Sequence, residues 1–130
     1  MDRGPLIADT DALIDYVEAE GCHLEMRRLL RAGRLATTAI SVFEIWRGCR
    51  TDGERAEARR MLRGVRVYPL ADTAARRAGE IELSLKARGE DIGERDTLIA
   101  AICLAVGRPL VTANAKHFGR VPGLTVLRAR

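Results

Sequence analysis

Short apolar segments alternate with longer helix-like segments along the whole chain, and this alternation restricts the possible folds more than any other feature. Strand-like segments occupy residues 5–9, 35–38, 65–70, 109–112 and 124–127. Helix-like segments occupy residues 10 or 11 to 20, 23–32, 39–49, about 53–63, 72–88 and 94–106, and residues 113–123 form a connection. Such alternation indicates βαβ units and a parallel sheet covered on both faces. We therefore predict an α/β fold with four or five short parallel strands flanked by helices. Its functional site should lie beyond the carboxyl ends of the strands.

The length of 130 residues suits one domain spanning residues 1–130. With 47% hydrophobic and 31% charged residues, the chain is too apolar for intrinsic disorder. We find no secretory signal pattern, and the longest weakly polar run, residues 98–107, is about half a membrane span. We therefore expect a cytoplasmic protein that is not inserted in a membrane. Cys22, Cys49 and Cys103 lack metal-binding spacing and are expected to be reduced core residues.

Charge is distributed unevenly along the chain. Residues 1–25 carry seven acids and one base, whereas residues 26–66 carry four acids and eleven bases. Residues 67–107 have a net charge of −2 and residues 108–130 have +5, within a total of +4. Twenty of the 22 basic residues are arginine, whose planar guanidinium suits phosphate. This pattern is typical of a phosphate-backbone binder with a cation site, although a general bias toward arginine would give the same count.

Two aspartates follow the first strand-like segment. Asp9 is the first polar residue after the apolar run, which places it at the carboxyl edge of the predicted sheet. An aspartate at such a position is often a helix cap. Asp11 can supply that cap instead, which would leave Asp9 free for chemistry.

Two further acids lie on helix-like segments. Glu44 is on a helix that is apolar around most of its circumference, so its carboxylate should be partly buried and need a partner. The alternative is a surface pair with Arg47. Asp96 begins the segment 94–106 and stands on its core-facing side, although it can also serve only the helix start.

Polar residues also follow the strand-like segment 109–112. Thr112 and Asn114 place oxygens at the end of this strand, either as turn residues or as part of a site. His117, in the turn that follows, suits a surface role, a phosphate contact or a catalytic role equally well.

Together, Asp9, Glu44 and Asp96 approach one edge of the sheet. Oxygen ligands without cysteine or a histidine cluster favour a hard ion, Mg²⁺ or Mn²⁺. A hard ion held by carboxylates on a basic protein indicates phosphoryl chemistry.

Four segments of the sequence are similar to those of a known family. They are "LIADTDALIDY", "SVFEIWRG", "IGERDTLIAA" and "GRPLVTANAKHFGRVPGL". In this order they resemble PIN-domain ribonucleases of the VapC toxin type, and the resemblance covers nearly the whole chain. It implies a Rossmann-like PIN domain and a Mg²⁺- or Mn²⁺-dependent endoribonuclease that hydrolyses RNA phosphodiester bonds with an activated water.

The resemblance also implies roles for individual residues. The three acids of the family correspond to Asp9, Glu44 and Asp96. Asp9 and Asp96 would hold the metal, and Glu44 would hold a second metal or position the attacking water. The fourth acid of many PIN domains is replaced here by Asn114, whose amide offers an oxygen without charge. Supporting groups would be Thr10, Asp11, Thr112 and Asn114.

Partners follow from the same resemblance. VapC-type proteins typically pair with a VapB-type antitoxin, whose C-terminal segment enters the acidic site, and they are commonly homodimers.

Two other functions remain open from the sequence. "IADTDAL" also resembles the strand and D-x-D motif of haloacid-dehalogenase-like phosphatases, with Lys86, Asp91 and Asp96 as counterparts of their later motifs. However, Asp91 and Asp96 do not follow an apolar strand. The third candidate is a non-catalytic, arginine-rich module that binds RNA or a protein partner, which the neutral Asn114 would favour.

Overall fold

Five short strands form one parallel sheet in the computed structural model, which describes residues 2–129. The strands are β1 (Leu6–Ala8), β2 (Leu35–Thr38), β3 (Arg66–Tyr68), β4 (Leu110–Thr112) and β5 (Val126–Arg128). Their order across the sheet is β3-β2-β1-β4-β5, and every neighbouring pair is parallel. The predicted α/β fold with a short parallel sheet is confirmed.

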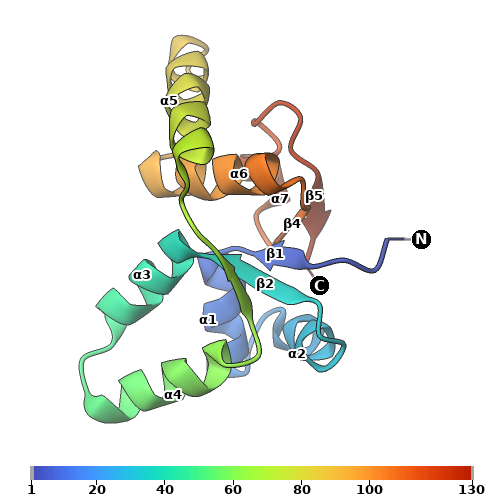
Figure 1. Cartoon of the computed structure of the whole chain (residues 1–130), viewed down its shortest axis with the longest axis vertical. Helices are drawn as coiled ribbons and strands as arrows, with labels where there is room; N and C mark the ends of the chain where they lie inside the picture. Colours follow the sequence, from blue (N-terminus) through green and yellow to red (C-terminus); the bar gives the residue numbers. More distant parts are fainter. Residues whose placement is uncertain (1, 130) are drawn as a thin grey trace.

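Helices cover both faces of the sheet (Figure 1). One face carries α1 (Thr10–Glu18), α2 (His23–Arg31) and α4 (Asp52–Leu62), and the other carries α5 (Asp72–Ala87), α6 (Glu94–Val106) and α7 (Ala115–Phe118). The remaining helix, α3 (Ala39–Gly48), follows β2 directly and contributes to both cores, since Ile40 packs with the α5–α6 side and Ile45 with the α1–α2 side.

The central strand β1 is buried on both of its faces. Leu6 and Ala8 belong to the core under α1 and α2, whereas Ile7 between them belongs to the core under α5 and α6. Successive side chains of a strand point to opposite faces, so all three are buried. The strand therefore appears in the sequence as a continuous apolar run instead of an alternating one.

The strand order places a reversal of the chain between β1 and β4. From β1 the chain continues to β2 and β3 on one side, and it returns to β4 and β5 on the other. Ligands bind at such reversal points in open parallel sheets, beyond the carboxyl ends of the strands. Asp9 directly follows β1 and Thr112 ends β4, so the fold brings these two polar residues to that point.

Local signals define the ends of several helices. Thr51 and Glu54 form a reciprocal capping box at the start of α4, in which each side chain accepts from the other residue's backbone N–H. Gly107 ends α6 in the left-handed conformation, with a φ of 68°, which glycine adopts without strain.

Some details differ from the sequence prediction. Residues 115–118, predicted as part of a connection, form the one-turn helix α7, which is held by the buried ring of Phe118. The last strand begins two residues later than its predicted start at residue 124, because β5 pairs with β4 through Val126 and Leu110.

Cys22 and Cys103 are buried free thiols as predicted, whereas Cys49 is only partly buried. Within residues 2–129, no helix has the length and apolar character needed to cross a membrane.

Candidate active site

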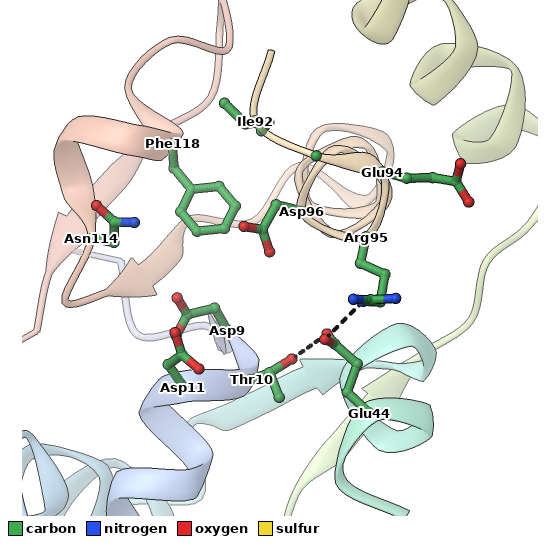
Figure 2. Close-up of a pocket in the computed structure, with 11 residues that line it drawn as sticks. Asp9, Thr10, Asp11, Glu44, Ile92, Glu94, Arg95, Asp96, Asn114 and Phe118 are labelled. Carbon is green, nitrogen blue, oxygen red and sulfur yellow. Dashed lines mark hydrogen bonds and ion pairs between the residues drawn. The ribbon is translucent and has the colours of Figure 1, made fainter. Parts of the chain in front are cut away.

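A pocket of about 340 Å³ opens at the carboxyl ends of the central strands (Figure 2). It is formed by the junction of β1 and α1, by α3, by the first turn of α6 and by the segment after β4. The polar residues that line it are Asp9, Thr10, Asp11, Glu44, Glu94, Arg95, Asp96 and Asn114, and its apolar wall includes Ile92 and Phe118. The three acids singled out in the sequence thus share one pocket, although they lie far apart in the chain.

Asp9 is buried at the base of this pocket, with 5% of its surface exposed. Its Oδ1 accepts a hydrogen bond from the backbone N–H of Ala12 at 3.0 Å, and its Oδ2 accepts one from the hydroxyl of Thr112 at 2.6 Å. Asp9 is therefore the N-cap of α1, and the alternative, that Asp11 supplies the cap, was wrong. The helix begins at Thr10, which places Asp11 inside its first turn. Capping uses only one of the two oxygens of Asp9, so it does not prevent a second role.

The surroundings of Asp9 disfavour its negative charge. Burial raises the pKa of Asp9 to about 6, against hydrogen bonds from Thr112 and Ala12 that lower it, and the nearby carboxylates of Asp11 and Asp96 raise it further. None of the ion pairs within residues 2–129 involves Asp9. A buried carboxylate without a cationic partner, close to other acids, has the electrostatics of a cation site.

Glu44 projects from α3 toward the same pocket, and its side chain is 18% exposed. Its Oε1 lies 2.7 Å from the hydroxyl of Thr10, which in turn lies 2.9 Å from the hydroxyl of Ser41. Because Thr10 has one hydroxyl proton and a carboxylate can only accept, Thr10 donates to Glu44 and accepts from Ser41. The other oxygen, Oε2, accepts from Nε of Arg95 at 3.1 Å. The predicted partial burial of Glu44 is confirmed.

The alternative pairing of Glu44 with Arg47 does not form. The guanidinium of Arg47 instead lies over the ring of Phe43, 5.2 Å from its centre. The apolar side chains of α3 are also less buried than the sequence indicated. Phe43 and Trp46 are 54% and 39% exposed, so part of the apolar surface of this helix faces solvent.

Asp96 lies in the first turn of α6, with its side chain 38% exposed. It is thus less enclosed than its predicted core-facing position implied. Its Oδ2 lies 2.9 Å from Nε2 of His117. Because an ionised carboxylate can only accept, Nε2 carries the hydrogen in this bond. Burial raises the pKa of Asp96, His117 opposes that shift through the hydrogen bond and its charge, and Glu44 and Asp11 add to it.

Thr112 connects two sides of the pocket. Its hydroxyl donates to Asp9 and accepts from the backbone N–H of Asn114 at 2.9 Å. Asn114 precedes α7 and lines the pocket, and its side chain makes no capping hydrogen bond. Asp11 is exposed at the pocket mouth.

The donor set of the pocket fits a hard divalent ion. Its carboxylates and amide can supply oxygen ligands, and the most buried of these groups, Asp9, forms no ion pair with a basic side chain within residues 2–129. Figure 2 shows the carboxylates of Asp9 and Asp96 on opposite sides of the same cavity. Within the described residues, no three Asp, Glu, His or Cys side chains converge closely enough to form a ready-made metal centre.

Three residues of the site were missed or left undecided from the sequence. Ser41 and Arg95 contact the Thr10–Glu44 pair, and His117 contacts Asp96. These contacts join residues 21 to 51 positions apart, so only the folded chain brings them together. The one local signal was the position of Arg95 next to Asp96 at a helix start.

Comparisons with known proteins bear on the family and the fold of the chain. The model of the PIN-domain family matches residues 6–124. "Ribonuclease VapC10" of Mycobacterium tuberculosis is 33% identical over 114 residues, which cover 87% of this chain and 85% of that protein. The "tRNA(fMet)-specific endonuclease VapC" of Salmonella typhimurium is 25% identical over 122 residues, which cover 91% of this chain and 92% of that protein. The solved structure of DNA-bound VapBC from Salmonella typhimurium shares the fold, with a TM-score of 0.85 at 22% identity over 98% of this chain and 99% of the matched chain.

Proposed function

Since the chain belongs to the PIN-domain family, among the VapC-type ribonucleases, we propose that it is a metal-dependent endoribonuclease that acts as the toxin of a toxin–antitoxin pair. The observation that carries this proposal is the meeting of Asp9, Glu44 and Asp96 in one pocket at the reversal point of the sheet. The names of the relatives, a ribonuclease and a tRNA endonuclease, support RNA as the substrate.

Each acid has a defined task in this proposal. Asp9 and Asp96 hold a Mg²⁺ or Mn²⁺ ion, and Glu44 holds a second ion or positions the attacking water. When bound, the ion would supply an activated water and would neutralise charge on the phosphate. The neutral amide of Asn114 contributes an oxygen at the edge of the site.

The neighbours of the acids keep them in place. Thr112 and the Ala12 N–H fix both oxygens of Asp9, and Thr10 fixes one oxygen of Glu44. Groups that are already oriented need not be reorganised during the reaction, which is how such contacts assist catalysis.

The phosphatase alternative is wrong, because the chain belongs to another family. Lys86, named as a counterpart of one of the later phosphatase motifs, lies on α5 and pairs with Glu82 at 3.5 Å. The non-catalytic module stays as the competing function, since it would have the same fold and differ only in a pocket that does not catalyse cleavage.

The partners follow from the proposed toxin function. We propose a VapB-type antitoxin as the protein partner, in line with the solved VapBC assembly, and a homodimer as the assembled toxin. We also propose that it acts in the cytoplasm, where the proposed RNA substrate and antitoxin would be found. We also propose that residues 1–130 form a single PIN domain, because the family model spans residues 6–124.

The test is a cleavage assay on purified protein that is free of antitoxin. Total RNA and p-nitrophenyl phosphate are each incubated with and without Mg²⁺ or Mn²⁺, using the parent, Asp96→Asn and Glu94→Gln. The last variant is a matched control, because Glu94 starts the same helix but its carboxylate points away from the other acids (Figure 2). We expect metal-dependent RNA cleavage that Asp96→Asn abolishes and Glu94→Gln retains.

Other outcomes distinguish the alternatives. RNA that is bound but left intact in every metal condition would support the non-catalytic module. Release of nitrophenol without RNA cleavage would contradict RNA as the substrate. Cleavage that survives Asp96→Asn would remove this pocket from the reaction.

A further inference from the structure

Arg95 is the one basic residue that lines the acidic pocket, within the part of the chain that the structure describes. Five acids line the same pocket: Asp9, Asp11, Glu44, Glu94 and Asp96. A phosphodiester that enters it carries negative charge and meets the carboxylates of Asp9, Glu44 and Asp96. Within the pocket lining, attraction from a positively charged side chain therefore comes from Arg95.

The helix itself gives no reason for an arginine at this position. Arg95 lies in the first turn of α6, where the partial positive charge of the helix N-terminus disfavours a cation. Its pair with Glu44 is half exposed on the arginine side, at 52%, and exposed ion pairs add little to stability. The helix start and the ion pair together thus offer no clear gain in stability from an arginine at this position.

The contact with Glu44 leaves most of the guanidinium available. The hydrogen bond uses Nε of Arg95 and Oε2 of Glu44, at 3.1 Å. An arginine has five N–H donors in a planar fork, and the terminal pair matches two oxygens of a phosphate. Arg95 can therefore contact a phosphate while it still borders Glu44, or exchange one anion for the other.

We propose that Arg95 binds a backbone phosphate of the RNA and that its pair with Glu44 is the resting arrangement, which the RNA displaces. This inference rests on the proposed ribonuclease function. The exchange has two effects at once: the phosphate gains a cation beside the site, and Oε2 of Glu44 is released for its own task. Oε1 stays hydrogen-bonded to Thr10, so Glu44 does not leave the pocket when Arg95 does.

The proposal predicts a distinct kinetic signature. Single-turnover cleavage of a fluorescein-labelled single-stranded RNA of mixed sequence is measured at a series of protein and KCl concentrations in Mg²⁺. Arg95→Gln should raise the protein concentration for half-maximal rate by roughly tenfold. It should also lower the slope of log affinity against log salt by about 0.7, the amount expected for one phosphate contact on a single strand.

Two variants separate charge from structure. Arg95→Lys keeps the charge and should retain the salt slope of the parent, with a smaller loss of affinity. Arg76→Gln is the matched control, because Arg76 forms the same kind of exposed Nε–carboxylate pair, with Asp72 at 3.0 Å, on α5. It should change neither affinity nor slope.

A double-mutant cycle with Glu44→Gln tests the exchange on binding alone, read by anisotropy of the same RNA in Mg²⁺. Removal of the competing carboxylate should tighten binding more when Arg95 is present than in the Arg95→Gln background, where only the loss of direct repulsion remains. Equal gains in the two backgrounds would contradict the exchange.

The inference is overturned if Arg95→Gln alters only the maximal rate or the Mg²⁺ requirement, since Arg95 would then act solely through Glu44. A parent that cleaves no RNA contradicts the proposed function instead. In that case the anisotropy of the labelled RNA decides, and equal affinities of parent and Arg95→Gln overturn the inference too.

Discussion

The buried charge of Asp9 should reduce the stability of the metal-free protein, so Asp9→Asn is expected to stabilise it. The pKa of Asp9 is raised from 3.8 to about 6, mainly by burial. A rise of roughly two units, at about 1.4 kcal/mol per unit, corresponds to about 3 kcal/mol. An asparagine can still accept from the Ala12 N–H and face the Thr112 hydroxyl, so the change removes charge with little loss of contacts.

The sign of the pH dependence follows from the direction of the shift. The folded protein binds a proton at Asp9 more tightly than the unfolded chain, so the parent loses stability as the pH rises from about 4 through about 6. The free energy of unfolding of Asp9→Asn does not include this pH-dependent loss. The variant should therefore match the parent near pH 4 and exceed it by up to about 3 kcal/mol above pH 7.

The assay is urea unfolding of both proteins across this pH range in EDTA. Asp11→Asn is the matched control, since Asp11 is exposed and its change should stay within about 0.5 kcal/mol. Added Mg²⁺ should stabilise the parent and not Asp9→Asn, because only a ligand that binds the folded state raises its stability. A difference between parent and Asp9→Asn that is constant with pH, or a variant that is less stable at high pH, would refute this electrostatic description.

Three further predictions address the residues around the acids. Thr112→Val removes the 2.6 Å hydrogen bond that lowers the pKa of Asp9, so the metal-free variant should lose stability over a pH range that extends higher than that of the parent. An unfolding profile identical to that of the parent would contradict this. His117→Ala removes a contact that lowers the pKa of Asp96, so the acid limb of the cleavage-rate profile should shift to higher pH, whereas an unshifted limb would exclude that role. Phe118→Ala leaves a cavity where a 2%-exposed ring packs beside the pocket, and should cost about 3–5 kcal/mol in urea unfolding; a loss below about 1 kcal/mol would show that α7 does not depend on this anchor.

The sequence predicted the architecture well because the relevant patterns are local. Three consecutive buried residues in β1 mark a strand covered on both faces, and the first polar residue after it lies at the sheet edge by necessity. The positions of Asp9, Glu44 and Asp96 on their elements could be predicted for the same reason. Their shared pocket required only that the strands be parallel and the site lie at their carboxyl ends.

The partners of these acids could not be predicted in the same way. The choice of Arg95 over Arg47 by Glu44 depends on how α6 packs against α3, and the contact of His117 with Asp96 depends on the short helix α7. Neither is set by spacing along one element. The cap of α1 was left open between Asp9 and Asp11, because a shift of two residues in the helix start exchanges the N-cap and first-turn positions.

The most direct test of the central claim is the position of Mn²⁺ in crystals of the protein, located by its anomalous scattering. The proposed site predicts a peak between the carboxylates of Asp9 and Asp96, within about 2.0–2.3 Å of an oxygen from each, and no such peak in Asp96→Asn crystals. A peak elsewhere, or none at a Mn²⁺ concentration that supports RNA cleavage, would contradict the assignment of this pocket as the metal-dependent ribonuclease site.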